Sequence, residues 1–131
     1  MKYFLEEIYK TETELIEVMK TRPWAIQYIK TPSEKTQLAA VKENGLVIQY
    51  IKNPSEDVQL TAVKQNGRAV QYIKNPSEDV QLAAVKRNSS AIQYIKNPSK
   101  KVILLYITTE INDSDDITPI RNYITDASEE I

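Results

Sequence analysis

The sequence has 131 residues, which suits one domain that buries roughly two-thirds of the surface of its unfolded chain. Apolar residues make up 41% and charged residues 27%, with only two glycines, which is typical of a helical globular protein and not of a disordered one. The absence of cysteine and histidine excludes disulfides, thiolate metal sites and the commonest general base. No apolar run is long enough to form a membrane span or a signal peptide, so we expect a cytoplasmic protein.

The net charge of −1 conceals an uneven distribution of charge along the chain. Residues 25–101 carry 12 Lys and Arg against six Asp and Glu, whereas residues 102–131 carry one Arg against seven acids. A basic array followed by an acidic end indicates either a polyanionic partner or an internal electrostatic contact. Two solvated surfaces are the third interpretation.

In chain order, the first predicted unit is an N-terminal cap over residues 1–24. The segment TETE from Thr11 has the pattern of a capping box and predicts a long helix over residues 11–20, with residues 2–10 as its short partner. Trp24 takes the place of a leucine in the next unit, and we expect its indole to cover the first open face of the fold. An exposed tryptophan that binds a partner is the alternative.

The centre of the chain, residues 25–111, repeats one 22-residue pattern. The four copies begin at Ile26, Ile48, Val70 and Ile92, and the second reads IQYIKNPSEDVQLTAVKQNG. A fixed period of this length is typical of a solenoid, in which each unit covers the apolar face of the next. We therefore predict an all-α fold: a right-handed α-solenoid of short helix pairs, with degenerate half-repeats as caps.

Each unit is predicted to contain one long and one short helix. In the second copy an N-cap at Asn53, a proline at the first helical position and a glutamate three residues after the cap predict a long helix that runs to about Gln65. The next two residues, Asn-Gly, tolerate the left-handed backbone of a helix C-cap, and a short helix is expected from about Arg68 to Lys74. In the third copy Ser89 replaces the glycine, so a left-handed backbone there would cost roughly 1 kcal/mol.

Glutamines occupy two different environments in the predicted unit. Gln71 lies opposite the apolar face of the short helix and should face water. Gln59 falls inside the apolar arc of the long helix, as do Gln37 and Gln81, so these amides should be buried and bonded to loop backbone or to adjacent units. A row of glutamines that reads a ligand is the alternative.

At the other end, residues 102–111 continue as a long helix, and residues 112–131 are expected to form an acidic C-terminal cap and tail. Three aspartates in that tail superficially resemble a calcium loop, but the turn glycine and the glutamate at the twelfth position are missing. No metal and no cofactor are therefore predicted. The whole chain, 1–131, is expected to be a single domain.

The repeated unit resembles a widespread family of short tandem helical repeats. Its AAVKxNG and QYxxN elements are similar to a domain of unknown function with units of the type LQYASEELKNDKEVVLAAVKQNG, frequent in bacterial, phage and giant-virus proteins. The likeness covers residues 25–101, implies a miniature of the HEAT and armadillo solenoids, and brings no catalytic residues. By analogy of fold, a small solenoid in a phage would suit an inhibitor of host machinery, such as an anti-CRISPR or other anti-defence protein, acting in the host cytoplasm.

No pattern in the sequence predicts catalysis. Serines recur at the predicted helix starts, where capping explains them, and the two glycines stand 22 residues apart, which excludes a phosphate-binding loop. We therefore expect a protein that is not an enzyme and that acts by binding.

Lysines that recur with the repeat are the candidate binding residues. At about 10 Å between stacked helices, two like charges in water repel by only ~0.4 kcal/mol, so such rows cost little. The predicted binding residues on these ladder faces are Gln49, Lys52, Lys64, Gln71, Lys74, Lys86, Lys30 and Lys96, with Trp24 as a secondary candidate. A protein partner, alone or in a nucleoprotein complex, is the leading interpretation. Binding of nucleic-acid backbone and self-assembly of the repeat are the alternatives, and no membrane partner is expected.

Overall fold

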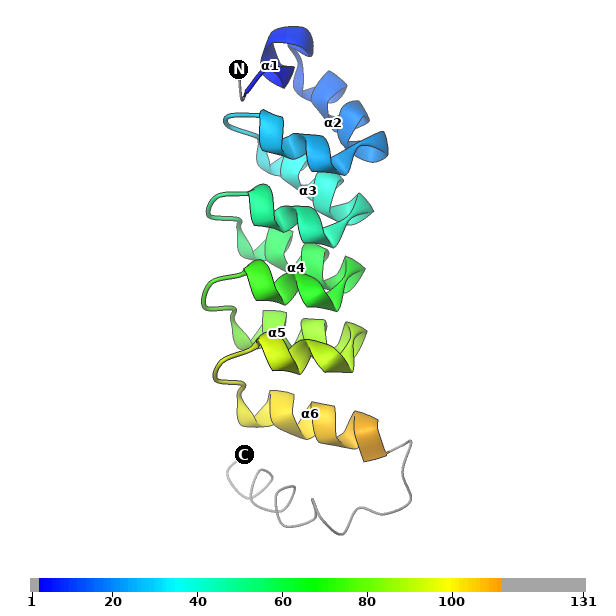
Figure 1. The fold of residues 1–131 in the computed structure, drawn as a ribbon, viewed down its shortest axis with the longest axis vertical. Helices are drawn as coiled ribbons and strands as arrows, with labels where there is room; N and C mark the ends of the chain where they lie inside the picture. The colour runs from blue at the N-terminus through cyan, green and yellow to red at the C-terminus, as the bar shows by residue number, and fades with distance from the viewer. Residues whose placement is uncertain (1–2, 112–131) are drawn as a thin grey trace.

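The computed structural model describes residues 3–111, and all regular secondary structure in this range is helical. The helices succeed one another in chain order along the long axis of the molecule, and consecutive long helices pack directly on each other (Figure 1). The predicted all-α class is confirmed. The predicted acidic cap and tail, 112–131, lies outside the described residues. Within the described range, no helix has both the length and the apolar character needed to cross a membrane.

The helices recur with the period of the sequence. In chain order they are α1 (Leu5–Ile8), α2 (Glu12–Thr21), η1 (Pro23–Tyr28), α3 (Glu34–Glu43), η2 (Gly45–Tyr50), α4 (Glu56–Gln65), η3 (Gly67–Tyr72), α5 (Glu78–Arg87), η4 (Ser89–Tyr94) and α6 (Lys100–Ile111). From α2 to α6, each long helix begins 22 residues after the previous one. The short elements η1 to η4 are six-residue 3₁₀-helices and not the seven-residue helices that the sequence predicts.

The long helices α3, α4 and α5 are capped by a serine, and α4 begins later than the sequence predicts, whereas Thr11 caps α2 as expected. Ser55 is the N-cap of α4, and its hydroxyl accepts a hydrogen bond from the backbone N–H of Val58 at 3.3 Å. Asn53, the predicted cap, instead has a φ of 52°, in the left-handed region that asparagine tolerates better than most residues. Asn75 has the same conformation, with a φ of 53°. These two asparagines therefore turn the chain, and the serine caps the helix.

The two glycines are required by close packing and not by a left-handed backbone. Neither has a positive φ, and Asn66, the C-cap of α4, is extended with a φ of −149°. A Cβ atom at Gly45 would collide with the backbone carbonyl oxygen of Ala62, and one at Gly67 would collide with that of Ala84. The predicted left-handed C-cap is thus wrong. Glycine is needed at these two positions because η2 and η3 approach the backbone of the next long helix there.

Ser89 occupies the glycine position where the next long helix has changed. Tyr106 in α6 stands 22 residues after Ala84, and Ser89 is half-buried whereas both glycines are buried. The Ser89 hydroxyl donates a hydrogen bond to Glu110 Oε1 at 3.0 Å. Positive φ angles among the described non-glycine residues occur only at the two asparagines named above, so the predicted left-handed backbone at Ser89 is also wrong.

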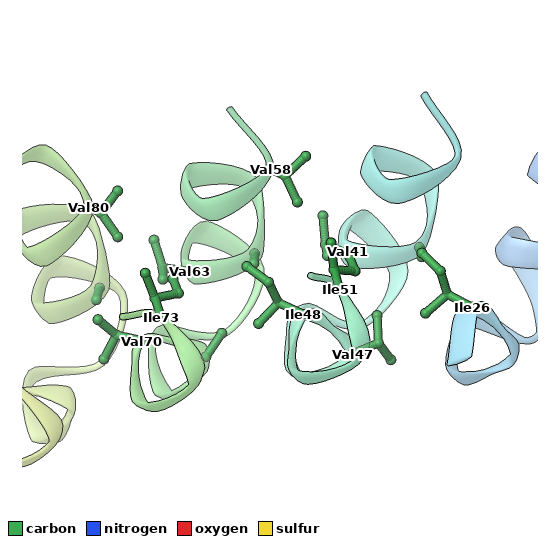
Figure 2. Close-up of a cluster of buried hydrophobic side chains, with 14 of the residues drawn as sticks. Ile26, Val41, Val47, Ile48, Ile51, Val58, Val63, Val70, Ile73 and Val80 are labelled. Atoms are coloured by element: carbon green, nitrogen blue, oxygen red, sulfur yellow. The ribbon is translucent and has the colours of Figure 1, made fainter. Parts of the chain in front are cut away.

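The core is a continuous row of apolar side chains contributed by every unit. In α4, Val58, Ala62 and Val63 are fully buried, as the periodicity predicts. Figure 2 shows valines and isoleucines of successive units, from Ile26 to Val80, lying side by side along the molecule. Isolated helices of ten residues or fewer are marginal in water, so each unit depends on burial against its neighbours.

The glutamines of the long helices hydrogen-bond to loop backbone, as predicted. The Nε2 atoms of Gln37, Gln59 and Gln81 each donate to the carbonyl oxygen of the proline five residues earlier, at 3.0 Å in all three cases. Gln81 Oε1 also accepts from the backbone N–H of Ser99 in the next loop, at 3.3 Å. These side chains are half-buried, less than expected, and they fasten each loop to its long helix.

The close approach at the glycines predicts a cost for the smallest added side chain. Gly67→Ala should destabilise the protein by about 1–3 kcal/mol, because the new methyl group forces two backbones apart. Urea denaturation measures the change. Ser89→Gly is the matched control and should bring no stabilisation, since it loses a hydrogen bond and relieves no strained φ. A Gly67→Ala protein as stable as the original would show that the backbones are not in close contact.

The left-handed asparagines give a second test of the loops. Asn75→Ala should destabilise the protein by about 1 kcal/mol, because alanine tolerates a positive φ poorly, whereas Asn75→Gly should not. Asn97 holds the same position in the next loop without a positive φ, so Asn97→Ala should change stability much less. Equal effects at both positions in thermal denaturation would contradict the assigned backbone.

Candidate binding surface

The structure places the predicted binding lysines on two separate parts of the surface. The first row lies in the loops that join each 3₁₀-helix to the next long helix and consists of Lys30, Lys52, Lys74 and Lys96. These loops form a column along one edge of the molecule, at the left in Figure 1. Lys64 and Lys86 lie instead in the last turns of α4 and α5, roughly 13 Å along the helix from its start. The two rows therefore do not form one binding face.

The predicted glutamines Gln49 and Gln71 lie beside the loop lysines. The Nε2 atom of Gln49 donates to the carbonyl oxygen of Leu46, and that of Gln71 donates to that of Arg68, both at 3.0 Å. Both side chains are exposed, as expected. The internal hydrogen bond holds each amide in one orientation and leaves its side-chain oxygen as a fixed acceptor.

Hollows lie between consecutive loops on this edge. One hollow, of about 660 Å³, separates the first two loops, and its polar lining includes Gln27, Lys30, Gln49, Tyr50, Lys52 and Asn53. Another, of about 440 Å³, separates the last two loops, and its polar lining includes Gln71, Lys74, Asn75, Tyr94, Lys96 and Asn97. Among residues 3–111, the lining of each hollow includes two lysines and no Asp or Glu. We name the exposed set Gln49, Tyr50, Lys52, Asn53 and its equivalents 22 and 44 residues later the loop edge.

Tyrosines are the site residues that the sequence analysis missed. Tyr50, Tyr72 and Tyr94 are 44%, 43% and 37% exposed, unusually much for large aromatic side chains that recur at one position. Tyr28, at the same position in the first unit, is half-buried, and its ring packs against Phe4 with 5.0 Å between centroids. The available signal is the constant placement of a tyrosine two residues before each lysine.

The lysines of the loop edge form no ion pairs with other residues in the described range. The ion pairs seen within residues 3–111 join Lys20 to Glu17 and Lys101 to Glu78, and no ladder lysine takes part. Hydrogen bonding and attraction by Glu17 raise the pKa of Lys20, which lies on α2. Some carboxylates near the loops accept hydrogen bonds from another unit: Glu34 accepts from the hydroxyl of Ser55 at 2.7 Å, and Glu6 accepts from the backbone N–H of Lys30.

Trp24 does not cover the end of the molecule as expected. Its indole is 52% exposed on η1, whereas Leu5 is buried and joins the core there with Phe4 packed against it. The expectation of a covering tryptophan is wrong because the segment around α1 fills that place. Trp24 is not part of the lining of the two loop hollows, so it forms a separate exposed aromatic site.

No metal site is found in the part of the chain that the structure describes, where no three His, Cys, Asp or Glu residues are placed to share an ion. The three tail aspartates that resemble a calcium loop lie beyond that part.

Comparison of the chain with protein-family models, with curated proteins and with solved structures finds no match. The resemblance to a helical-repeat family therefore stays a prediction.

Proposed function

We propose that this chain is a non-enzymatic protein-binding scaffold, built as a right-handed α-solenoid of four 22-residue units, and that it holds its partner on the loop edge. The observation that carries the proposal is the repeated pairing of an exposed tyrosine with a lysine that forms no ion pair within residues 3–111, beside two hollows whose described lining holds no carboxylate. Such a surface offers contact area and positive charge at the same place in successive units.

The chemistry of the loop edge suits binding better than catalysis. A tyrosine supplies a large apolar ring with a polar tip, and a lysine row steers an acidic partner toward it. The described lining of the two hollows presents phenol, amide and amine groups, with no carboxylate or imidazole to act as a general base.

The placement of acids favours a protein over nucleic acid as the partner. Glu56 and Asp57 are exposed in the first turn of α4, directly after the loop, and Glu78 and Asp79 repeat them in α5. Acidic side chains therefore follow two of the lysine-bearing loops along the chain. A continuous phosphate backbone would meet both signs, whereas a protein segment can place isolated carboxylates at the lysines.

A narrower form of the proposal is that binding inhibits the partner. By obstructing a host machine, such as a CRISPR effector or another defence protein, a small stoichiometric scaffold could act without any chemistry of its own. This form is supported by the family resemblance and by analogy of fold alone.

The proposal predicts that charge reversal on the loop edge weakens binding. The double variant Lys52→Glu and Lys74→Glu should bind its partner more than ten-fold less tightly, equivalent to ~1.4 kcal/mol, and the loss should shrink at high salt. The partner is first captured from the source or host lysate, with half of the sample treated with nuclease, and affinity is then measured by calorimetry. Thermal stability should hardly change, because both side chains are exposed.

The double variant Lys64→Glu and Lys86→Glu is the matched control, with the same change of charge on the long helices. It should retain most of the affinity. Equal losses in both variants would show that overall charge and not the loop edge decides binding. Loss of capture after nuclease treatment would favour the nucleic-acid alternative, and full binding by the loop-edge variant would direct attention to Trp24.

A further inference from the structure

The loop edge repeats one set of polar groups every 22 residues, once in each successive unit. Each long helix packs directly on the next, and stacked helices lie about 10 Å apart. The recurring sets are Gln49, Tyr50, Lys52 and Asn53; Gln71, Tyr72, Lys74 and Asn75; and Gln93, Tyr94, Lys96 and Asn97. A single ligand that contacts all three sets in the same way must therefore repeat at roughly 10 Å.

A polyproline II segment has this repeat. It has three residues per turn at 3.1 Å each, so the same side faces the surface every ~9.3 Å. A β-strand covers a similar distance in three residues, but its side chains alternate and residues three apart face opposite sides. An α-helix matches only after about seven residues, or two turns, and leaves most of its acceptors and donors satisfied internally.

The groups on the loop edge also suit the chemistry of such a segment. The backbone of polyproline II makes no internal hydrogen bonds, so its polar groups are open to the fixed amides of Gln49 and Gln71. Aromatic-lined grooves are a recurring way to bind this conformation, and Tyr50 and Tyr94 each line a loop hollow. Within the described residues, the lining of each hollow includes two lysines and no Asp or Glu, which suits a ligand that brings a carboxylate.

We infer that the loop edge binds an acidic polyproline II segment of about nine residues, with a carboxylate at every third position facing the lysine row. This inference rests on the proposed protein-binding function and specifies its ligand. One turn of the segment lies against each of the three units.

Synthetic peptides test the inference without the natural partner. The probe is the labelled peptide (Glu-Pro-Pro)4, and its matched control has the same composition with the four glutamates adjacent. Fluorescence anisotropy with the full chain should show the spaced peptide binding at least about ten-fold tighter than the clustered one. The difference should persist at moderate salt, because it arises from spacing and not from net charge.

Variants of the protein locate the binding. The double change Tyr50→Ala and Tyr94→Ala should weaken binding of the spaced peptide about ten-fold, whereas Tyr50→Phe and Tyr94→Phe should retain it by keeping the rings. Lys52→Glu with Lys74→Glu should abolish the preference for the spaced peptide, and Lys64→Glu with Lys86→Glu should leave it unchanged. Circular dichroism of each variant checks the fold.

Equal binding of spaced and clustered peptides would overturn the inference, because charge alone would then explain it. Tighter binding of a helical peptide with glutamates seven residues apart would overturn it as well. If the spaced peptide does not bind while the partner from the lysate still depends on the loop-edge lysines, the ligand class is wrong and the proposed function stands.

Discussion

The structure depends on the burial of each short helix pair against the next. Neither a ten-residue α-helix nor a six-residue 3₁₀-helix is stable alone in water, so the fully buried valines and alanines between units supply most of the stabilisation. The tightest point is the contact of Gly45 and Gly67 with the backbone of the following helix. Because that contact leaves no room for a side chain, it fixes the distance between units in the centre of the molecule.

A fixed distance in the core becomes a fixed distance on the surface. A hydrogen bond from Gln59 to a proline carbonyl oxygen holds the loop on its long helix. Gln37 and Gln81 form the same bond in their units. The loop lysines and tyrosines therefore recur with the spacing of the buried helices. This connection between core and surface is the physical basis for regarding the loop edge as a site for a ligand that is itself periodic.

The ends of the molecule depart from this regularity in a coordinated way. Tyr28 leaves the loop edge to pack against Phe4, so the first unit lacks an exposed tyrosine at this position. At the other end, Tyr106 replaces an alanine and Ser89 replaces the glycine that faced it. The change to Tyr106 and the change to Ser89 accompany each other: the larger side chain is in α6, and Ser89 is less buried than the glycines at its position. The exposed tyrosines at this position are thus limited to the three sets of the loop edge.

The sequence by itself determined the helical class, the period and the need of the long-helix glutamines for partners within the protein, because these follow from repeated apolar spacing and from the need to satisfy buried amides, and the structure selects the proline carbonyls. Tertiary structure alone decided that Ser55 and not Asn53 caps α4, since both residue types cap well and the path of the loop chooses between them. It also decided why the glycines are needed, because a local Asn-Gly pattern does not distinguish a left-handed backbone from close packing against a distant helix. The separation of the two lysine rows and the exposure of the tyrosines likewise depend on how loops and helices are placed in space, which a one-dimensional repeat does not specify.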